Sequence, residues 1–236
     1  MGQSITTSPI RALEGETLVL ATTIKGVTVP VNFHEAKVYC ASQWRLGLAP
    51  ILRKNFVYVG TTYTDYTTYL TDKLSTTHMP LDAMATSSYC YFATLEEVRG
   101  FYFVIDGTNK NANAATLDFE YYSATGWTDV AGDSDDTTSG GAALAVSGVY
   151  TFTLPASTKL AVNSVGDYYW YRFTPSAALS ATIDITEVVP VYSSSSLAYM
   201  EGGIEYQFSI NKDKVGGFNV SATSGTPTLD LSWVKH

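Results

Sequence analysis

The sequence predicts an all-β protein: an antiparallel β-sandwich of jelly-roll-like form, with few or no helices and an extended N-terminal arm. Apolar and polar residues alternate in short stretches, and Gly-, Pro- and Ser-rich turns separate these stretches. Aromatic residues make up 13% of the 236 residues and include 17 Tyr, whereas charged residues make up only 15%. Aromatic and β-branched residues favour strands, so composition and patterning agree. The predicted strands include residues 101–106, 117–122, 149–154, 168–173, 204–210 and 228–234.

Four stretches of the sequence have patterns that predict particular local structures. Residues 117–122 place apolar side chains on one face and acidic ones on the other, as in a half-buried strand. Residues 168–173 are aromatic on both faces, which predicts a central strand buried between two layers. Residues 46–52 are apolar but contain Gly and Pro, which favours a packed loop. Residues 95–100, preceded by a capping Thr and closed by Gly, are typical of one short helical turn.

Three parts of the chain are expected. Residues 1–36 form an extended arm, since Pro and β-branched residues favour strand or polyproline geometry there. Residues 37–192 form the β-sandwich. Residues 193–236 add C-terminal strands, which either complete the sandwich or form a small appended β unit, and the serine run 193–196 is the linker. The arm has too few apolar residues to fold alone, so we expect it to pair with a strand of a neighbouring subunit.

The charge and the cysteine content limit the classes of binding partner and the cellular compartment that we expect. The chain has 14 basic and 22 acidic residues, a net charge of −8 and no Lys/Arg-rich run, which argues against nucleic acid and anionic membranes as partners. The first residues do not resemble a secretory signal, and no apolar run is long enough to span a bilayer. Synthesis in a reducing cytosol predicts that Cys40 and Cys90 are free, buried thiols, since a disulfide would need oxidising surroundings.

Nucleophilic catalysis is not favoured by the serine motif of this sequence. Gly132 and Ser134 flank an aspartate, in a pattern that some esterases use for the nucleophile. A serine nucleophile needs a histidine base that a third group orients. The sequence has only His34, His78 and His236, and none belongs to an Asp-x-x-His pair. The motif is therefore interpreted as a solvated turn.

The acidic residues suggest two further kinds of site. Asp118 and Glu120 lie on one strand face, where a glycosidase pair would need them, but alternating charges usually mark the solvated face of a strand. Asp133, Asp135 and Asp136 form a weak candidate for a non-EF-hand Ca²⁺ site, because Ca²⁺ often uses clustered Asp in loops. A bare acidic loop is the alternative. We therefore expect no enzymatic activity and no cofactor.

A run of motifs between about residues 99 and 190 carries a resemblance to a known family. Residues 121–130 pass from paired tyrosines through a Gly turn into Trp127, residues 150–155 form a strand that ends at Pro, and residues 169–173 read Tyr-Trp-Tyr-Arg-Phe. In this order they resemble an aromatic-rich β-sandwich module of structural proteins in tailed-bacteriophage virions. The resemblance implies an assembled, non-enzymatic role and supplies no catalytic residues.

The expected function is therefore that of a structural component of a tailed-phage virion, either capsid-associated (a decoration protein) or part of the tail or baseplate. Such a protein is made in the host cytoplasm and located in the virion. Its expected partners are copies of itself and the major capsid or tail proteins. Sheets with many aromatic and few charged residues tend to associate, and open sheet edges accept a partner strand. The alternative is a carbohydrate-binding module for host attachment, because exposed Tyr and Trp rings also bind sugars.

Particular aromatic residues are assigned to contact or to core. The predicted interface residues are Trp44, Tyr63, Tyr66 and Tyr69, since Tyr offers a large contact area with little loss of entropy. The predicted aromatic core contains Trp127, Trp170 and Phe173, and Trp127 is expected to close a hairpin. Arg172 is expected to stack on an aromatic ring in a structural role.

Overall fold

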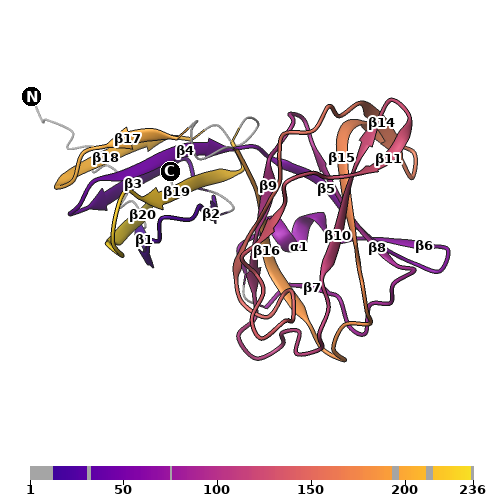
Figure 1. The fold of residues 1–236 in the computed structure, drawn as a ribbon. Coiled ribbons are helices and arrows are strands. Elements are labelled where there is room, and N and C mark those ends of the chain that lie inside the picture. Colours follow the sequence, from indigo (N-terminus) through magenta and orange to yellow (C-terminus); the bar gives the residue numbers. More distant parts are fainter. Residues whose placement is uncertain (1–12, 31–32, 75, 193–196, 211–214, 235–236) are drawn as a thin grey trace, which may run out of the picture.

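The computed structural model describes residues 13–30, 33–74, 76–192, 197–210 and 215–234. The predicted all-β class is confirmed, because 54% of the chain is in strands and 2% is in helix. The strands form antiparallel sheets that pack as two β-sandwiches (Figure 1). No helix within the described ranges has the length and the apolar character that crossing a membrane requires.

The smaller sandwich is built from both ends of the described chain. One of its sheets has the strand order β1-β20-β3-β18 and the other has the order β17-β4-β19-β2. The bounds are β1 (Leu13–Val19), β2 (Lys25–Thr28), β3 (Glu35–Cys40), β4 (Trp44–Ala49), β17 (Ala198–Met200), β18 (Ile204–Ser209), β19 (Gly217–Ala222) and β20 (Thr228–Val234).

The larger sandwich is an insertion between β4 and β17. A seven-stranded sheet follows the order β11-β10-β15-β8-β5-β6, with β14 also paired to β15, and a five-stranded sheet follows β12-β13-β9-β16-β7. The bounds in the first sheet are β5 (Leu52–Val59), β6 (Thr62–Asp65), β8 (Tyr89–Thr94), β10 (Leu117–Ser123), β11 (Gly126–Asp129), β14 (Lys159–Val162) and β15 (Val165–Pro175). Those in the second are β7 (Met79–Pro80), β9 (Gly100–Ile105), β12 (Ser134–Asp135), β13 (Gly148–Thr151) and β16 (Asp184–Val191), and the helix α1 is Thr67–Thr71.

Apolar clusters define the order of the four sheets. One cluster, which includes Trp44 and Trp233, fills the smaller sandwich, and another, which includes Phe92 and Phe173, fills the larger one. A third cluster joins the sandwiches and contains Ile24, Ala49 and Leu197 of the smaller unit. We call this contact between the two sandwiches the seam. Across the seam, the cluster contains residues of β9, β13 and β16 in the five-stranded sheet: Tyr102, Val149, Val189 and Val191. The seven-stranded sheet is therefore the outermost layer, on the side away from the smaller sandwich (Figure 1).

Polar contacts also connect the sandwiches across the seam. The Asn219 side chain is completely buried, accepts the backbone N–H of Tyr192 at 3.0 Å and donates to the Pro190 carbonyl at 3.3 Å. From the larger unit, the Lys73 ammonium pairs with the Glu16 carboxylate and lies 5.2 Å from the Trp233 ring centroid. The two sandwiches therefore share buried apolar surface and satisfied polar groups.

The structure divides the chain differently from the expected arm, sandwich and C-terminal unit. Residues 13–19 pair with β20 and residues 25–28 pair with β19, so the partner strands lie in the same chain and not on a neighbouring subunit. The C-terminal strands β19 and β20 complete the smaller sandwich and supply the strands with which the N-terminal residues pair. Alternation of side chains shows that a segment is a strand but does not name its partner. Residues 1–12 and the predicted linker 193–196 lie outside the described residues.

Two local predictions are wrong for identifiable reasons. The expected loop 46–52 is mostly strand, because only Pro50 and Ile51 interrupt β4 and β5. Residues 95–99 contain no helical turn, since the Thr94 hydroxyl donates to the Glu96 carbonyl at 2.6 Å and holds a tight bend. The helix instead follows β6, where the Asp65 carboxylate accepts the N–H of Thr67 at 2.9 Å. Cys40 and Cys90 are free and buried, as predicted, and lie in different sandwiches.

The close approach of the sandwiches leads to a prediction at Gly26 of β2. A Cβ atom there would lie 2.6 Å from the Cβ of Val189 and 2.9 Å from that of Tyr102. We expect Gly26→Val to lower the free energy of unfolding by about 2 kcal/mol, because the seam must open to admit the side chain. Gly15→Val in β1 is the matched control, since its nearest atom would be 3.9 Å away. Equal stability of the two variants in urea denaturation would contradict the tight seam.

Candidate functional site: an aromatic sheet face

A fourth cluster lies on the outer surface of the seven-stranded sheet. It is made of aromatic side chains from six strands, and we call it the aromatic face. Its members are Phe56, Tyr58, Tyr63, Tyr89, Tyr91, Tyr122, Trp127, Tyr168 and Trp170. Ala93, Leu160, Val162 and Val165 pack with them. The other three clusters lie between two sheets, whereas no described sheet covers this one.

Strand alternation places these rings on the outside. In β8, Cys90 and Phe92 point into the core of the larger sandwich, so Tyr89 and Tyr91 point the other way. The same holds in β15, where Trp170 belongs to the outer cluster. Residues 168–173 are therefore aromatic on both faces, as the sequence indicates, but a second sheet covers only one of those faces.

The rings contact one another in a continuous path across the sheet. The centroids of Tyr58 and Tyr63 are 4.7 Å apart, those of Tyr63 and Tyr91 are 5.7 Å apart, and those of Tyr91 and Trp127 are 5.6 Å apart. The path ends at Tyr122, 5.4 Å from Trp127 in an edge-to-face arrangement. These separations are typical of favourable aromatic pairs, so the rings are held in fixed positions before any ligand arrives.

Arg172 lies within the aromatic face and is fully engaged there. Its guanidinium carbon is 4.1 Å from the ring centroid of Tyr89 and 4.2 Å from that of Trp127, so two rings sandwich it. Its Nε donates to the Glu120 carboxylate at 2.6 Å, and both side chains are largely buried. The predicted stacking of Arg172 is confirmed, although its ring partners come from β8 and β11. The ion pair leaves the middle of the face close to neutral.

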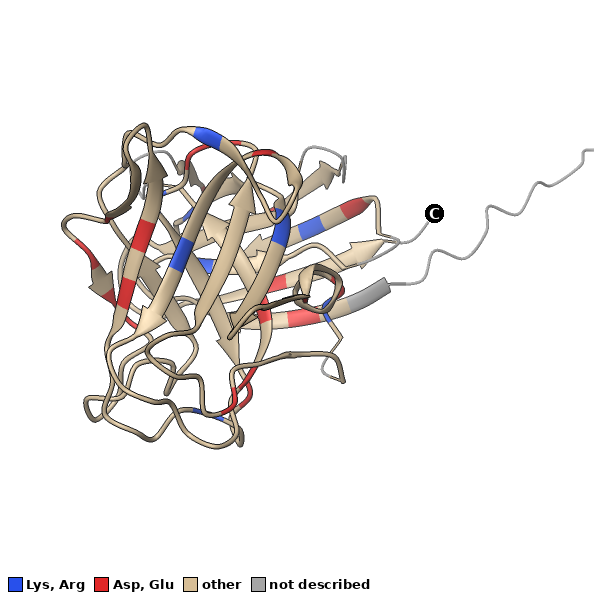
Figure 2. Cartoon of the chain, turned by 90° about the vertical axis from the view of Figure 1, so that its right-hand side faces the viewer, with Lys and Arg blue, Asp and Glu red and all other residues tan. Residues whose placement is uncertain are grey.

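Solvent reaches the face only in part. Tyr58, Tyr63, Tyr89 and Trp127 are half-buried, whereas Phe56, Tyr91 and Trp170 are buried. Burial raises the pKa of Tyr91 to about 12, so its phenol stays protonated at neutral pH. Figure 2, which looks onto this side of the molecule, shows few charged positions on the sheet. The surface is apolar with hydroxyl groups at its ring edges.

An acidic groove adjoins the face at β10 and β11. Its volume is about 440 Å³, and its wall includes the Tyr89 ring and the carboxylates of Asp118, Glu120, Asp129 and Asp133. Asp118 and Glu120 share the outward face of β10, as the sequence predicts. Glu120, however, is bound to Arg172 and is not the solvated group that was expected. The groove offers hydrogen-bond acceptors beside an aromatic ring.

The predicted interface residues are distributed over three places. Trp44 is fully buried in the smaller sandwich and so cannot contact a partner. Tyr63 belongs to the aromatic face. Tyr66 precedes α1 and Tyr69 lies within it, with ring centroids 5.9 Å apart, and Tyr69 is 45% exposed.

The predicted core residues and the further ring positions also have defined places. Phe173 and Trp170 are both completely buried, as predicted, Phe173 in the larger core and Trp170 in the cluster of the aromatic face. Trp127 is only partly buried and belongs to the aromatic face. Trp127 closes the hairpin opposite Tyr122, as expected. Tyr58 and Tyr89 were missed as surface residues, although a ring at every second position of β5 and β8 is a signal for them.

The acidic loop does not assemble a metal site. The Asp133 carboxylate accepts the Tyr150 hydroxyl, and Asp135 accepts the N–H of Thr137 at 2.8 Å, so each acid satisfies its own local contact. Asp136 is exposed. Within the described ranges, no three His, Cys, Asp or Glu side chains are close enough to share a metal ion.

The motif formed by Gly132, Asp133 and Ser134, interpreted from sequence as a solvated turn, has no histidine close to it among the described residues. Ser134 lies in β12 at the edge of the five-stranded sheet. His78 contacts the Asp184 carboxylate at 3.2 Å near β7, and His34 hydrogen-bonds through its backbone in the smaller sandwich. His236 lies outside the described residues.

A scan against models of protein families finds no match to this chain, and a search of curated proteins finds no similar sequence. What the aromatic face binds is therefore inferred from its own geometry and chemistry.

Replacing Arg172 tests how the aromatic face is held together. We expect Arg172→Met to lower the free energy of unfolding by about 2 kcal/mol. The reason is that the largely buried Glu120 carboxylate loses its ion-pair partner and stays surrounded by aromatic rings. Lys54→Met is the control. The pair that Lys54 forms with Asp65, at 2.7 Å, is more exposed, so its loss should cost less than about 1 kcal/mol. Urea denaturation of both variants measures the difference, and equal losses would contradict a buried, stacked arginine.

Proposed function

We propose that the chain is a non-enzymatic structural protein of a tailed-phage virion that assembles through its aromatic face. It binds either copies of itself or the major capsid or tail proteins. The observation that carries the proposal is the position of the fourth aromatic cluster, on the outside of the outermost sheet. Phe56, Tyr91 and Trp170 are buried in this cluster, whereas the rings of Tyr58, Tyr63, Tyr89 and Trp127 are partly exposed. Apolar surface on soluble proteins can mark an interaction site, and these four rings are the accessible part of the face.

The composition of the aromatic face suits a protein partner. Interface centres are enriched in Tyr, Trp and Arg and depleted in Lys, Asp and Glu, and the energetic hot spots are often the same residue types. The face supplies tyrosine and tryptophan rings in fixed positions, so little side-chain entropy is lost when a partner binds. The ion pair between Arg172 and Glu120 is already formed and adds no net charge to be desolvated.

The virion setting is supported by the resemblance between residues 99 and 190. Its motifs map onto the β10–β11 hairpin, β13 and β15. Two of its residues, Trp127 and Trp170, belong to the aromatic face. The proposal includes a position in the capsid, the tail or the baseplate. Separating these parts of the particle and finding which one contains the protein decides among the three.

A glycan is the second candidate ligand for this surface, as in a carbohydrate-binding module for host attachment. The acidic groove favours it, because sugars stack their C–H faces on rings while their hydroxyl groups donate to carboxylates. Soaking with cell-wall saccharides tests this candidate. Binding that Asp118→Asn and Tyr89→Ala both weaken would support it, and lack of binding at millimolar saccharide would exclude it.

The assembly proposal predicts the effect of removing two rings. We expect the double variant Tyr58→Ser, Tyr63→Ser to bind particles or other copies roughly tenfold more weakly or worse, since interface tyrosines are frequent hot spots. The measurement is co-sedimentation with particles, combined with analytical ultracentrifugation of the protein alone.

The matched control removes two exposed tyrosines from the smaller sandwich. Tyr39 and Tyr199 are 40% and 66% exposed and lie outside the aromatic face. We expect the double variant Tyr39→Ser, Tyr199→Ser to bind normally. Equal binding by both double variants, each with an unchanged melting temperature, would overturn the assignment of the contact surface.

A further inference from the structure

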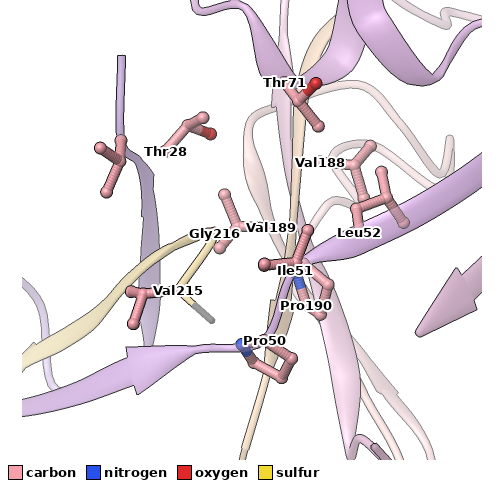
Figure 3. A pocket seen from close by; sticks show the side chains of 11 residues that line it. Thr28, Pro50, Ile51, Leu52, Thr71, Val188, Val189, Pro190, Val215 and Gly216 are labelled. Carbon is pink, nitrogen blue, oxygen red and sulfur yellow. The ribbon is translucent and has the colours of Figure 1, made fainter. Parts of the chain in front are cut away.

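A pocket lies at the seam between the two sandwiches and is separate from the aromatic face. Its volume is about 260 Å³, and both units contribute to its wall (Figure 3). Val29 and Val215 belong to the smaller sandwich, whereas Leu52 and Val188 belong to the larger one. Ile51, in the short connection between them, also faces the pocket. The lining is therefore mainly aliphatic.

The backbone around the pocket offers few hydrogen-bonding groups. Pro50 and Pro190 form part of the wall and have no N–H to donate. The Gly216 carbonyl already accepts the N–H of Val29 at 3.1 Å. A Cβ at Gly216 would lie 2.8 Å from the Pro50 carbonyl oxygen, so the strands approach as closely as glycine allows. The wall is consequently both apolar and tightly built.

One polar group in the wall is unsatisfied. Thr28 is 3% exposed, and its hydroxyl has no hydrogen-bond partner among the described residues. Figure 3 shows Thr28 and Thr71 on opposite sides of the pocket, with the Thr28 oxygen turned toward the interior. The Thr71 hydroxyl donates to the Thr67 carbonyl at 2.9 Å and is already satisfied. A buried hydroxyl without a partner is unfavourable, and a bound group that pairs with it would remove that cost.

Size and polarity together define what fits. A cavity of about 150 Å³ with an aliphatic and aromatic wall accommodates benzene. This pocket is larger, and most of the residues that line it are aliphatic. The matching occupant is a compact apolar body that carries one hydrogen-bonding group.

We propose that the seam pocket binds a compact apolar small molecule with a single hydroxyl or carbonyl group, and that this group pairs with the Thr28 hydroxyl. Because both sandwiches line the pocket, the bound molecule stabilises their contact. This inference is independent of the assembly role of the aromatic face.

The test uses two probes that differ by one hydroxyl group, 4-ethylphenol and ethylbenzene, with the full chain. We expect saturation-transfer NMR to detect both and to give tighter binding for 4-ethylphenol. Thr28→Val keeps the side-chain shape and removes the hydroxyl. It should weaken 4-ethylphenol roughly 3- to 10-fold, since one hydrogen bond is lost, and leave ethylbenzene unchanged or tighter.

A second variant tests the location. Val215→Phe fills the pocket and should abolish binding of both probes, whereas Val19→Phe, at a 62% exposed position of β1, should not affect them. If Val215→Phe fails to fold, the Thr28→Val comparison still decides.

Three results would overturn the proposal. They are no binding of either probe at millimolar concentration, equal affinity of 4-ethylphenol for the wild type and Thr28→Val, and self-association that Val215→Phe abolishes. The last result would show that a side chain of a second copy fills the pocket.

Discussion

The architecture depends on the pairing between the first and last described strands. β1 and β3 both pair with β20, and in these registers Leu18, Leu229 and Cys40 meet on the buried side of the sheet. Closing a long loop costs little more entropy than closing a shorter one, because the cost grows only with the logarithm of its length. The burial of these side chains can therefore offset the closure of a loop that contains a whole second sandwich.

The order of the layers that follows from this pairing determines which sheet surfaces are covered. The smaller sandwich covers the outer surface of the five-stranded sheet. One of the two outer faces of the inserted sandwich is therefore buried at the seam. The other face, on the seven-stranded sheet, has no described sheet over it, and Tyr58, Tyr63, Tyr89 and Trp127 remain partly exposed there. The same geometry creates the seam pocket, because two rigid sandwiches that meet along β2, β4 and β16 leave space beside their contact. The aromatic face and the seam pocket are thus two consequences of one insertion.

Particular elements show how far the sequence determines this structure. Alternation in residues 117–122 and 228–234 predicts β10 and β20 closely, because side-chain period two is a local property. The partner of β1 is 213 residues away at Thr17 and Asp230, and no local signal specifies it. Likewise, the rings of residues 168–173 predict burial on both faces. Trp170 is completely buried, but among side chains of its own sheet, such as Phe56 and Val162, and not beneath a second sheet. Tertiary contacts decide which of these two kinds of burial occurs, so the sequence could not distinguish them.

We propose that the outer face of the seven-stranded sheet is the contact surface. Hydroxyl-radical footprinting with mass spectrometry measures it directly, by comparing side-chain oxidation in the free protein and in assembled particles. We expect Tyr58, Tyr63 and Tyr89 to become protected in particles while Tyr39 and Tyr199 remain as reactive as before. Unchanged oxidation of the first three, with protection elsewhere, would contradict it.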